Sequence, residues 1–481
     1  MAANAVSGFR YARLADDLEG KIRDGVYRSG EKMPSLRKLH GQTGLSITTV
    51  YQAYVELEKR GVVAPRQKSG YYVQPLLGRI LPPPEVQKLH PEPKKVTVNA
   101  LAYAIVDDMG NPDFLQLGGS TVMPELLPFK QLARTVRSLS MEAMKRSLMR
   151  YEDPYGNAEL KRQIAKRMVG QARQTVLDQM VITSGCIEAV NLCLRAIGDA
   201  GDTVVVESPT YPWFLQIIED QNKFALEIPT DPQTGIDLDQ LEQAVEKNAV
   251  AACLLVPNFH NPLGFVMPED RKKALVAMMT EKKIPIIEDN IHGELYFGRQ
   301  RPSTLKSYDR KGLVIHCGSF SKTLSPGLRV GWTLPGRYTD RVRRLKMDGN
   351  VASPTLNQQV VARFLKDGAF DRHLRRLRTA LKNQITNTAL AIARYFPDDT
   401  RITAPAGGLT LWVELNRRVD GLKVFHAARK RKISIFPGAI CSTTDRYNNC
   451  IRISCGYPWT EKTEAGIRTL AEIIADPSSR A

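Results

Sequence analysis

Apolar side chains near the N-terminus recur at a helical step. Over 11–25 the step is four residues, and it is carried by Leu14, Leu18, Ile22 and Val26. Ser35 is placed to cap a second helix that ends near Thr43-Gly44, because a serine oxygen accepts from the free N–H groups of a first turn. Ser46 stands in the same way before a third helix over 47–60, whose inward-facing residues are Val50, Tyr54 and Leu57. The pattern therefore predicts three short helices.

Two short apolar runs that follow predict a β-hairpin. They are 62–64 and 70–73, and the tip between them, 66–69, is basic. Two helices joined by a tight turn and followed by such a hairpin are typical of a winged helix-turn-helix. Residues 1–75 contain 12 Lys or Arg and 7 Asp or Glu, a balance that favours nucleic acid. The alternative is a small three-helix domain with a solvated basic face.

The next segment, 76–112, is rich in proline. Proline removes backbone donors and restricts its neighbours, so we expect no regular element over 81–95. A short helix around 99–109 is the exception. The segment is predicted to be a domain linker that, when extended, reaches roughly 110 Å and can lay the first domain on a partner subunit.

From residue 113 to residue 481, nearly unbroken apolar runs alternate with helical patterns. The predicted strands are 181–183, 203–206, 251–256, 284–287 and 313–317, and helices are predicted over 187–197 and 213–220. Such strands lie in a largely parallel sheet covered on both faces. The expected fold is therefore multidomain, with a small winged helix-turn-helix and a large α/β domain. Ligands of such sheets bind beyond the carboxyl ends of the strands.

Composition adds a partner class and a compartment. The formal net charge of +18 and the pI near 9.5 favour a polyanionic partner. The sequence lacks an apolar run of membrane-spanning length and a signal peptide, so we expect no membrane partner and a cytoplasmic location. The seven cysteines show no metal-ligand spacing, and scattered thiols fit a reducing compartment. No metal site is predicted.

A lysine between small hydroxyl residues is the strongest chemical signal. In Ser319-Phe320-Ser321-Lys322 the lysine supplies an amine for a Schiff base. The two serine hydroxyls, with Arg329 beyond a Pro-Gly turn, suit a dianionic phosphate. The combination fits covalent capture of an aldehyde that carries a phosphate. An ordinary exposed turn lysine is the alternative.

Four other polar clusters follow predicted strands. They contain Ser184-Gly185 at a helix start, Tyr211 between two prolines, Asn261 in a turn, and Asp289 after an apolar run. A helix N-terminus binds phosphate, and an aromatic ring stacks on a flat heterocycle. Taken singly, the first three also fit ordinary turns or packed side chains. Asp289 is harder to dismiss, since a carboxylate there needs a cationic partner or solvent.

Residues 1–75 resemble the winged helix of GntR-type transcription regulators. The resemblance is carried by Pro34-Ser35-Leu36-Arg37, Gly44-Leu45-Ser46 and 68–73. It implies a double-stranded DNA operator, with Arg37 on phosphate and 46–60 in the major groove. The implied DNA-binding residues are Ser35, Arg37, Ser46, Thr48, Thr49, Gln52, Arg66, Lys68 and Gly70. Ile47 stands where the family usually has an arginine, so more of the readout falls to Thr48, Thr49 or Gln52.

Residues 113–475 resemble fold-type I pyridoxal-phosphate enzymes of the class I/II aminotransferase family, on the ordered motifs above. The resemblance implies an internal aldimine on Lys322, Asp289 at the pyridine nitrogen, Asn261 at the ring hydroxyl and Tyr211 stacked on the ring. The implied phosphate ligands are Ser184, Gly185, the backbone of Cys186 and Ile187, Ser319, Ser321, Arg329 and, from the partner subunit, Tyr151. A substrate carboxylate would bind Arg452 beside the loop Gly118-Gly119.

The sequence departs from the family after the aspartate. The family places a tyrosine two or three residues later, where it donates to the ring hydroxyl, and this chain has Ile291 and His292. Histidine can hydrogen-bond there but titrates near neutral pH, which puts the rate of transamination in question more than cofactor binding. The alternative for His292 is a polar side chain that faces away.

The whole chain resembles MocR-type regulators, which join these two domains. The resemblance implies a head-to-tail homodimer through the aminotransferase-like domain, and an amino acid, an amine or pyridoxal phosphate as the sensed molecule. The alternative is a working aminotransferase with an incidental or autoregulatory basic appendage, and turnover of paired amino and keto acids separates the two. A cofactor-free domain is disfavoured by the intact lysine and aspartate.

Overall fold

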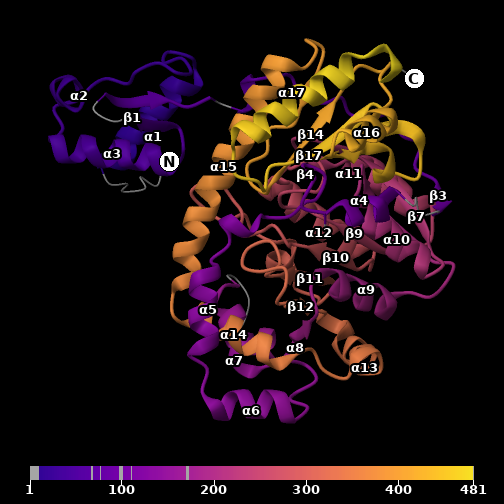
Figure 1. The fold of residues 1–481 in the computed structure, drawn as a ribbon. Helices are drawn as coiled ribbons and strands as arrows, with labels where there is room; N and C mark the ends of the chain where they lie inside the picture. The colour runs from indigo at the N-terminus through magenta and orange to yellow at the C-terminus, as the bar shows by residue number, and fades with distance from the viewer. Residues whose placement is uncertain are drawn as a thin grey trace, which may run out of the picture. The chain divides into compact units, whose positions relative to one another are not determined.

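The structure is a computed structural model that describes residues 10–66, 69–75, 77–96, 101–109, 111–168 and 173–479. The chain forms two compact units, Met1–Pro82 with Phe297–Arg299 and Pro83–Tyr296 with Gln300–Ala481 (Figure 1). Within the described residues no helix combines the length and the apolar composition that a bilayer crossing requires.

The smaller unit is a winged helix-turn-helix, as predicted. Its elements are α1 (Arg10–Arg23), α2 (Leu36–Thr43), α3 (Ile47–Lys59), β1 (Val63–Arg66) and β2 (Gly70–Val73). Both predicted caps form, because Ser35 Oγ accepts from Lys38 N at 3.2 Å and Ser46 Oγ from Thr49 N at 3.1 Å. One buried cluster holds the unit together, and it includes Leu14, Leu18, Ile22, Val50, Tyr54, Leu57, Val63 and Val73.

The predicted first helix runs too far at its C-terminal end. α1 stops at Arg23, and Gly25 adopts a φ of 83°, which turns the chain out of the helix. Val26 is therefore 64% exposed instead of continuing the apolar face.

The larger unit is built on the predicted, largely parallel sheet, with strand order β3-β7-β6-β9-β10-β11-β12-β5. The bounds are β3 (Pro93–Lys95), β5 (Val181–Thr183), β6 (Thr203–Ser208), β7 (Phe224–Asp231), β9 (Val250–Leu255), β10 (Ile286–Asp289), β11 (Val314–Ser319) and β12 (Gly331–Leu334). Strands β7, β6, β9, β10 and β11 are parallel, and β12 runs antiparallel between β11 and β5.

Helices cover this sheet through two hydrophobic clusters. α9 (Cys186–Ile197) and α10 (Pro212–Asp220) share the first cluster with the central strands. α7 (Ala158–Lys166) and α14 (Thr355–Lys366) share the second with the residues around β12. The remaining helices of this part are α5 (Phe129–Arg137), α6 (Met141–Met149), α8 (Arg173–Gln179), α11 (Leu238–Lys247), α12 (Glu269–Glu281) and α13 (Thr339–Asn350).

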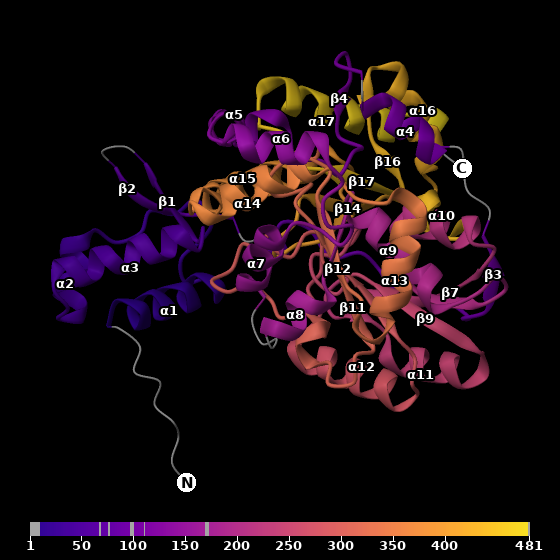
Figure 2. The same cartoon turned by 90° about the horizontal axis from the view of Figure 1, so that it is seen from below.

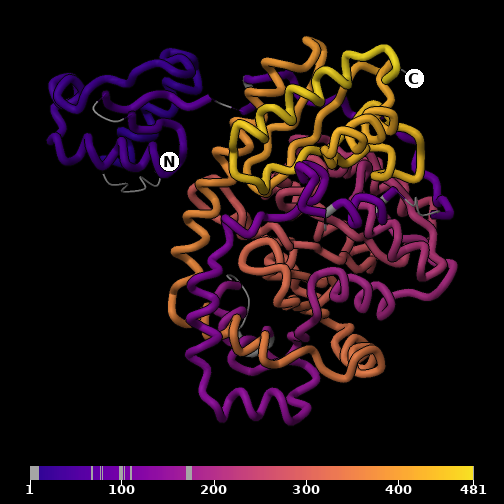
Figure 3. The backbone as a smooth tube through the Cα atoms, in the orientation of Figure 1, coloured from indigo at the N-terminus to yellow at the C-terminus, as the bar shows by residue number. Residues whose placement is uncertain are grey.

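The C-terminal elements form a second layer. Its antiparallel sheet has the order β13-β14-β17-β16, with α16 (Gly421–Lys430) and α17 (Glu461–Ala475) beside it. The strands are β13 (Arg401–Ile402), β14 (Thr410–Glu414), β16 (Phe436–Pro437) and β17 (Cys450–Ser454), and a separate pair joins β4 (Leu115–Gln116) to β15 (Ile433–Ser434). The long α15 (Ala369–Tyr395) runs from α14 up to these elements (Figure 3).

The proline-rich segment is more ordered than expected. Pro93–Lys95 forms β3, which pairs antiparallel with β7, so the prediction of no regular element over 81–95 is wrong there. An edge strand tolerates a proline at its first residue, because no partner needs its missing N–H. The predicted helix near 99–109 is confirmed as α4 (Leu101–Met109), which Figure 2 shows beside α16. Its Asp108 pairs with Arg429 of α16 at 2.9 Å. From Pro83 onward this segment belongs to the larger unit.

Candidate functional site

The carboxyl ends of the central strands open onto one pocket. Its lining residues are Ser120, Cys186, Ile187, Tyr211, Val256, Asn261, Asp289, Ile291, His292, Ser321, Lys322 and Arg329. All of these except Ser120, Val256 and Ile291 are candidate residues from the sequence, so segments far apart in the chain converge as the fold class requires.

Lys322 lies just after β11, is partly buried and lines this pocket. Its Nζ donates to the backbone carbonyl of Ser120. Burial, with the charge of Arg452 second, lowers the pKa of Lys322 to about 8. An appreciable fraction of the amine is therefore neutral near physiological pH, which is the state that attacks an aldehyde.

Asp289 ends β10 on the same side of the sheet. Its Oδ1 accepts from Ile291 N at 2.8 Å and from Cys186 Sγ at 3.3 Å. Burial raises the pKa of Asp289, since desolvation penalises the carboxylate. A bound ligand with a protonated ring nitrogen would supply a cation to pair with the carboxylate of Asp289. The Cys186 thiol is a contact that the sequence analysis missed, because only the backbone of this residue was considered.

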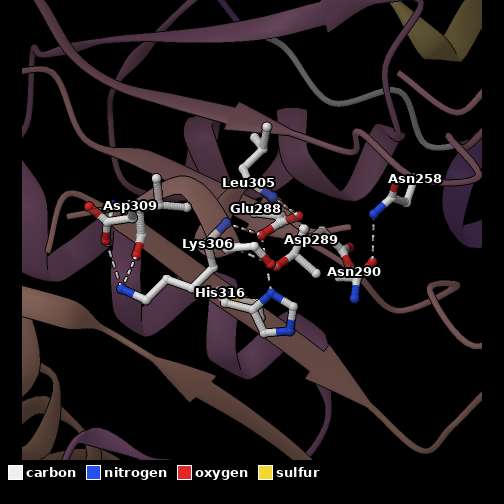
Figure 4. A network of polar contacts seen from close by, with 12 residues as sticks. Asn258, Glu288, Asp289, Asn290, Leu305, Lys306, Asp309 and His316 are labelled. Atoms are coloured by element: carbon white, nitrogen blue, oxygen red, sulfur yellow. Dashed lines mark hydrogen bonds and ion pairs between the residues drawn. The ribbon is translucent and has the colours of Figure 1, made fainter. Parts of the chain in front are cut away.

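A buried network holds the strand end that carries Asp289 (Figure 4). The neighbouring Glu288 accepts from Leu305 N at 2.9 Å, from Lys306 N at 3.2 Å and from His316 Nδ1 at 3.1 Å. These donors come from the 3-10 turn Leu305–Tyr308 and from β11. Glu288 therefore binds β10 to its surroundings and fixes the position of the next residue.

Three groups form an anion cradle beside Lys322. Ser319 Oγ lies 2.9 Å from Ser321 Oγ, and Arg329 Nη1 donates to Ser321 Oγ at 3.4 Å. Arg329 Nη2 also donates to the Ser184 carbonyl at 2.6 Å. Gly185 has a φ of 111°, which favours glycine, and a Cβ there would lie 2.5 Å from Arg329 Nη2, so a larger residue would displace this guanidinium.

The N-terminus of α9 completes the cradle. A set of hydrogen bonds that the sequence did not reveal supports it. α9 begins at Cys186, so the N–H groups of its first turn face the cradle. Ser184 N donates to Glu188, which is held in turn by the buried Lys346 at 2.8 Å. Lys346 also donates to Ser353 Oγ at 2.8 Å. No spacing in the sequence signals a contact between α9 and α13.

Arg452 extends from the middle of β17 and is fully buried. Its Nη1 donates to Asn261 Oδ1 at 2.7 Å and its Nη2 to the Gly118 carbonyl at 2.6 Å, and the guanidinium carbon lies 3.7 Å from the Phe436 ring centre. Burial lowers the pKa of Arg452 to about 10, and no carboxylate in the described part of the chain pairs with it. A Cβ at Gly118 would lie 2.6 Å from Ser434 Oγ.

Two aromatic residues close the pocket. Tyr211 precedes α10 and stacks on Trp213 with ring centres 5.6 Å apart, and burial raises the pKa of Tyr211 to about 12. His292 is 3% exposed, and its Nδ1 lies 3.2 Å from the Phe259 carbonyl oxygen. His292 is also one of the residues that line the pocket.

Tyr151 and Gly119 are two further candidate residues that do not line the pocket. Tyr151 follows α6 and is 88% exposed, which is the condition for reaching another subunit. Gly119 follows Gly118, and its carbonyl accepts from Thr121 N at 2.8 Å.

The smaller unit presents a separate polar face. Arg37 on α2 and Thr48 and Gln52 on α3 are exposed. Thr49 Oγ1 lies 2.8 Å from Ser46 Oγ, so this hydroxyl serves the helix cap. In the wing, Arg66 lies 4.1 Å from the Tyr72 ring centre and Gly70 has a φ of 108°. Lys68 lies outside the described residues.

The fold defines a two-domain protein that joins a winged helix-turn-helix to a large α/β domain, and comparison with known proteins identifies its family. Residues 10–73 match the gntR family of bacterial regulatory proteins, and residues 121–470 match aminotransferase class I and II. The chain belongs to the transcription regulators that join a gntR-type helix-turn-helix to an aminotransferase class I and II domain, the MocR-type architecture.

Two relatives and one solved structure illustrate the likeness. The chain is 36% identical over 465 residues to the uncharacterized HTH-type transcriptional regulator YjiR of Escherichia coli strain K12, covering 97% of this chain and 98% of the relative. It is 34% identical to YdcR of the same strain, over 97% and 99% of the two chains. The crystal structure of LysN, an α-aminoadipate aminotransferase of Thermus thermophilus, is 28% identical with a TM-score of 0.72 and covers 79% of this chain and 95% of LysN. That structure is a complex with N-(5'-phosphopyridoxyl)-L-leucine.

Proposed function

We propose that this protein is a pyridoxal-phosphate-dependent transcription regulator. It binds a DNA operator through the exposed face of α2, α3 and the wing, and it senses an amino acid, an amine or the cofactor itself at Lys322. The observation that supports this most is the meeting of a partly buried amine, a buried carboxyl group and a buried guanidinium in and beside one pocket, on a chain with a gntR-type domain.

The residues present fit pyridoxal phosphate. Lys322 would hold its aldehyde carbon, Asp289 its ring nitrogen and Asn261 its ring hydroxyl, while Ser319, Ser321, Arg329 and the start of α9 would hold its phosphate. When bound, this group supplies an electrophilic carbon and a ring that withdraws electrons. The protein's share is to bury a reactive amine, to keep the ring nitrogen protonated through Asp289, and to orient the ring against Tyr211.

The buried guanidinium of Arg452 supports a ligand that carries a carboxylate group. A buried guanidinium without a carboxylate is costly, and an amino acid would supply the partner. We expect Arg452→Gln to raise the amino acid concentration needed for a spectral response by about a hundredfold or more, since losing one member of a buried charge pair costs that much. Absorption titrations measure it, with Arg418→Gln, at an exposed arginine after β14, as the control. An equal loss for amines that lack a carboxylate would contradict the assignment.

The dimer interface is proposed to lie on α5, α6 and the loop that follows. Its exposed apolar residues are Phe129, Val136, Met141, Leu148, Met149 and Tyr151. Such a patch marks a protein interface, and Tyr151 would extend from it into the partner subunit's pocket.

We expect the double variant Met141→Glu with Met149→Glu to shift the chain to monomers, because the carboxylates would have to be desolvated in the interface. Sedimentation equilibrium measures the mass against 53.7 kDa per chain. Its cofactor affinity should fall as well, since the partner subunit's tyrosine is lost. Leu390→Glu, at an exposed apolar residue of α15, is the control, and a double variant that stays dimeric would contradict this interface.

Transamination is a second candidate, favoured by the lowered pKa of Lys322, which suits a proton carrier. Return of the pyridoxal absorbance on adding a keto acid would support it.

The regulator itself is tested by titrating purified protein with amino acids while the visible spectrum is recorded. A protein that stays colourless with added pyridoxal phosphate would exclude both functions.

A DNA partner and seven unpaired cysteines fit the cytoplasm.

A further inference from the structure

His292 has only one hydrogen-bonding nitrogen left for a ligand. It lies in the turn after β10, and its Nδ1 is 3.2 Å from the Phe259 carbonyl oxygen. A carbonyl oxygen accepts and does not donate, so Nδ1 carries a proton toward it. Burial, with the charge of Lys322 second, lowers the pKa of His292 to about 3. The imidazole is therefore neutral at physiological pH, and its other nitrogen, Nε2, is an acceptor without a proton.

This acceptor is buried, and its hydrogen-bonding capacity is unused. Among the described residues, nothing hydrogen-bonds His292 Nε2. The titratable groups that act on the ring are Lys322 after β11, Arg452 on β17 and His260 after β9, and each disfavours a second proton on it. A buried acceptor without a donor is destabilising, and a ligand O–H or N–H in the pocket would relieve it.

We propose that His292 Nε2 accepts a hydrogen bond from the ring hydroxyl of the cofactor bound beside Lys322. The pocket thereby keeps the proton on this oxygen up to a higher pH than it would if a tyrosine donated a hydrogen bond from the same position. The proposal rests on the proposed function, namely that the pocket holds pyridoxal phosphate. A donor stabilises the oxyanion that proton loss leaves behind, whereas a lone pair repels it. Replacing a donor by an acceptor therefore makes proton loss harder.

The consequence is regulatory. A bound cofactor that keeps its proton stays electrophilic, so the sensor responds to amines over a pH range that extends further upward. His292 is thus a positioning and tuning residue of this pocket, and the sign of its effect is opposite to that of a tyrosine.

The test is a pH titration of the absorbance of the cofactor-loaded protein in three forms. Wild type presents an acceptor, His292→Phe neither group, and His292→Tyr a donor. The expected order of midpoints is His292→Tyr lowest, His292→Phe intermediate and wild type highest, with the extremes about one pH unit or more apart. A His292→Phe midpoint above wild type would mean that His292 donates, and three equal midpoints would mean that it does not touch the cofactor. Either result overturns the proposal.

Two controls keep the outcomes separable. His426→Phe, at an exposed histidine of α16, should titrate as wild type does. Released pyridoxal phosphate is quantified in every sample, so a wild-type protein that takes up none refutes the proposed function, whereas equal midpoints in loaded proteins refute only the role of His292. Should His292→Phe fail to fold, nitrogen-15 NMR of wild-type protein labelled at histidine decides the tautomer. An unprotonated Nε2 at residue 292 is expected, and a protonated one contradicts the proposal.

Discussion

Lys322→Ala is expected to abolish covalent attachment of pyridoxal phosphate. The amine of Lys322 is the one that lines the pocket among the described residues, and its lowered pKa makes it reactive. After reduction with borohydride and digestion, wild type should carry a phosphopyridoxyl group on the peptide that contains residue 322. The variant should carry none, while the cradle at Ser319, Ser321 and Arg329 still binds the phosphate without a covalent bond.

The control for this experiment is Lys311→Ala, at an exposed lysine before β11, which should label as wild type does. The variant itself should fold, because an alanine in place of a partly buried amine removes a desolvation penalty. An adduct of equal yield on another lysine would show that Lys322 is not the attachment point.

Deletion of residues 1–82 is expected to remove specific DNA binding by a factor of about a thousand or more, the usual gap between specific and non-specific affinity. The boundary follows the compact units, so the larger unit keeps its pocket and should still take up pyridoxal phosphate. Gel-shift or anisotropy measurements at several salt concentrations check this. Salt-sensitive specific binding that persists in the truncated protein would place the DNA site elsewhere.

Point variants refine that result. Arg37→Ala should weaken binding evenly across DNA sequences and lower the salt slope by about 1, as expected for one phosphate contact. Gln52→Ala should instead change which sequences are preferred, because we propose that its exposed side chain on α3 contacts base edges. Lys21→Ala serves as the control, since Lys21 is engaged with Asp17 on α1 at 2.7 Å.

Local patterns predicted the elements well and their ends less well. The four-residue step of Leu14, Leu18 and Ile22 identified the buried face of α1, but periodicity does not report where a glycine with positive φ ends a helix, so Val26 was misplaced. The prediction from proline content, that no regular element forms, was likewise wrong for Pro93–Lys95. Whether a proline is tolerated depends on which edge of a sheet the strand occupies, and that is a property of the whole fold.

The pocket was predictable where residues stand in an ordered series of motifs and unpredictable where two distant side chains meet. Lys322 and Asp289 stand out from residue type and position, and Arg452 from the resemblance to the aminotransferase family. The support of Ser184 by Glu188 and Lys346 joins helices whose contact follows from tertiary packing. The tautomer of His292 depends on the direction of one carbonyl, that of Phe259, which no sequence pattern encodes.

The central claim is that one molecule binds DNA and answers to a ligand at Lys322. It is tested most directly by following DNA anisotropy and visible absorbance in the same sample during an amino acid titration, with an operator selected by the full-length protein from random DNA. The account predicts that both signals change together at one ligand concentration, and that Lys322→Ala binds the operator but responds in neither. A spectral change that leaves operator affinity untouched would contradict it and leave an aminotransferase with an attached DNA-binding domain.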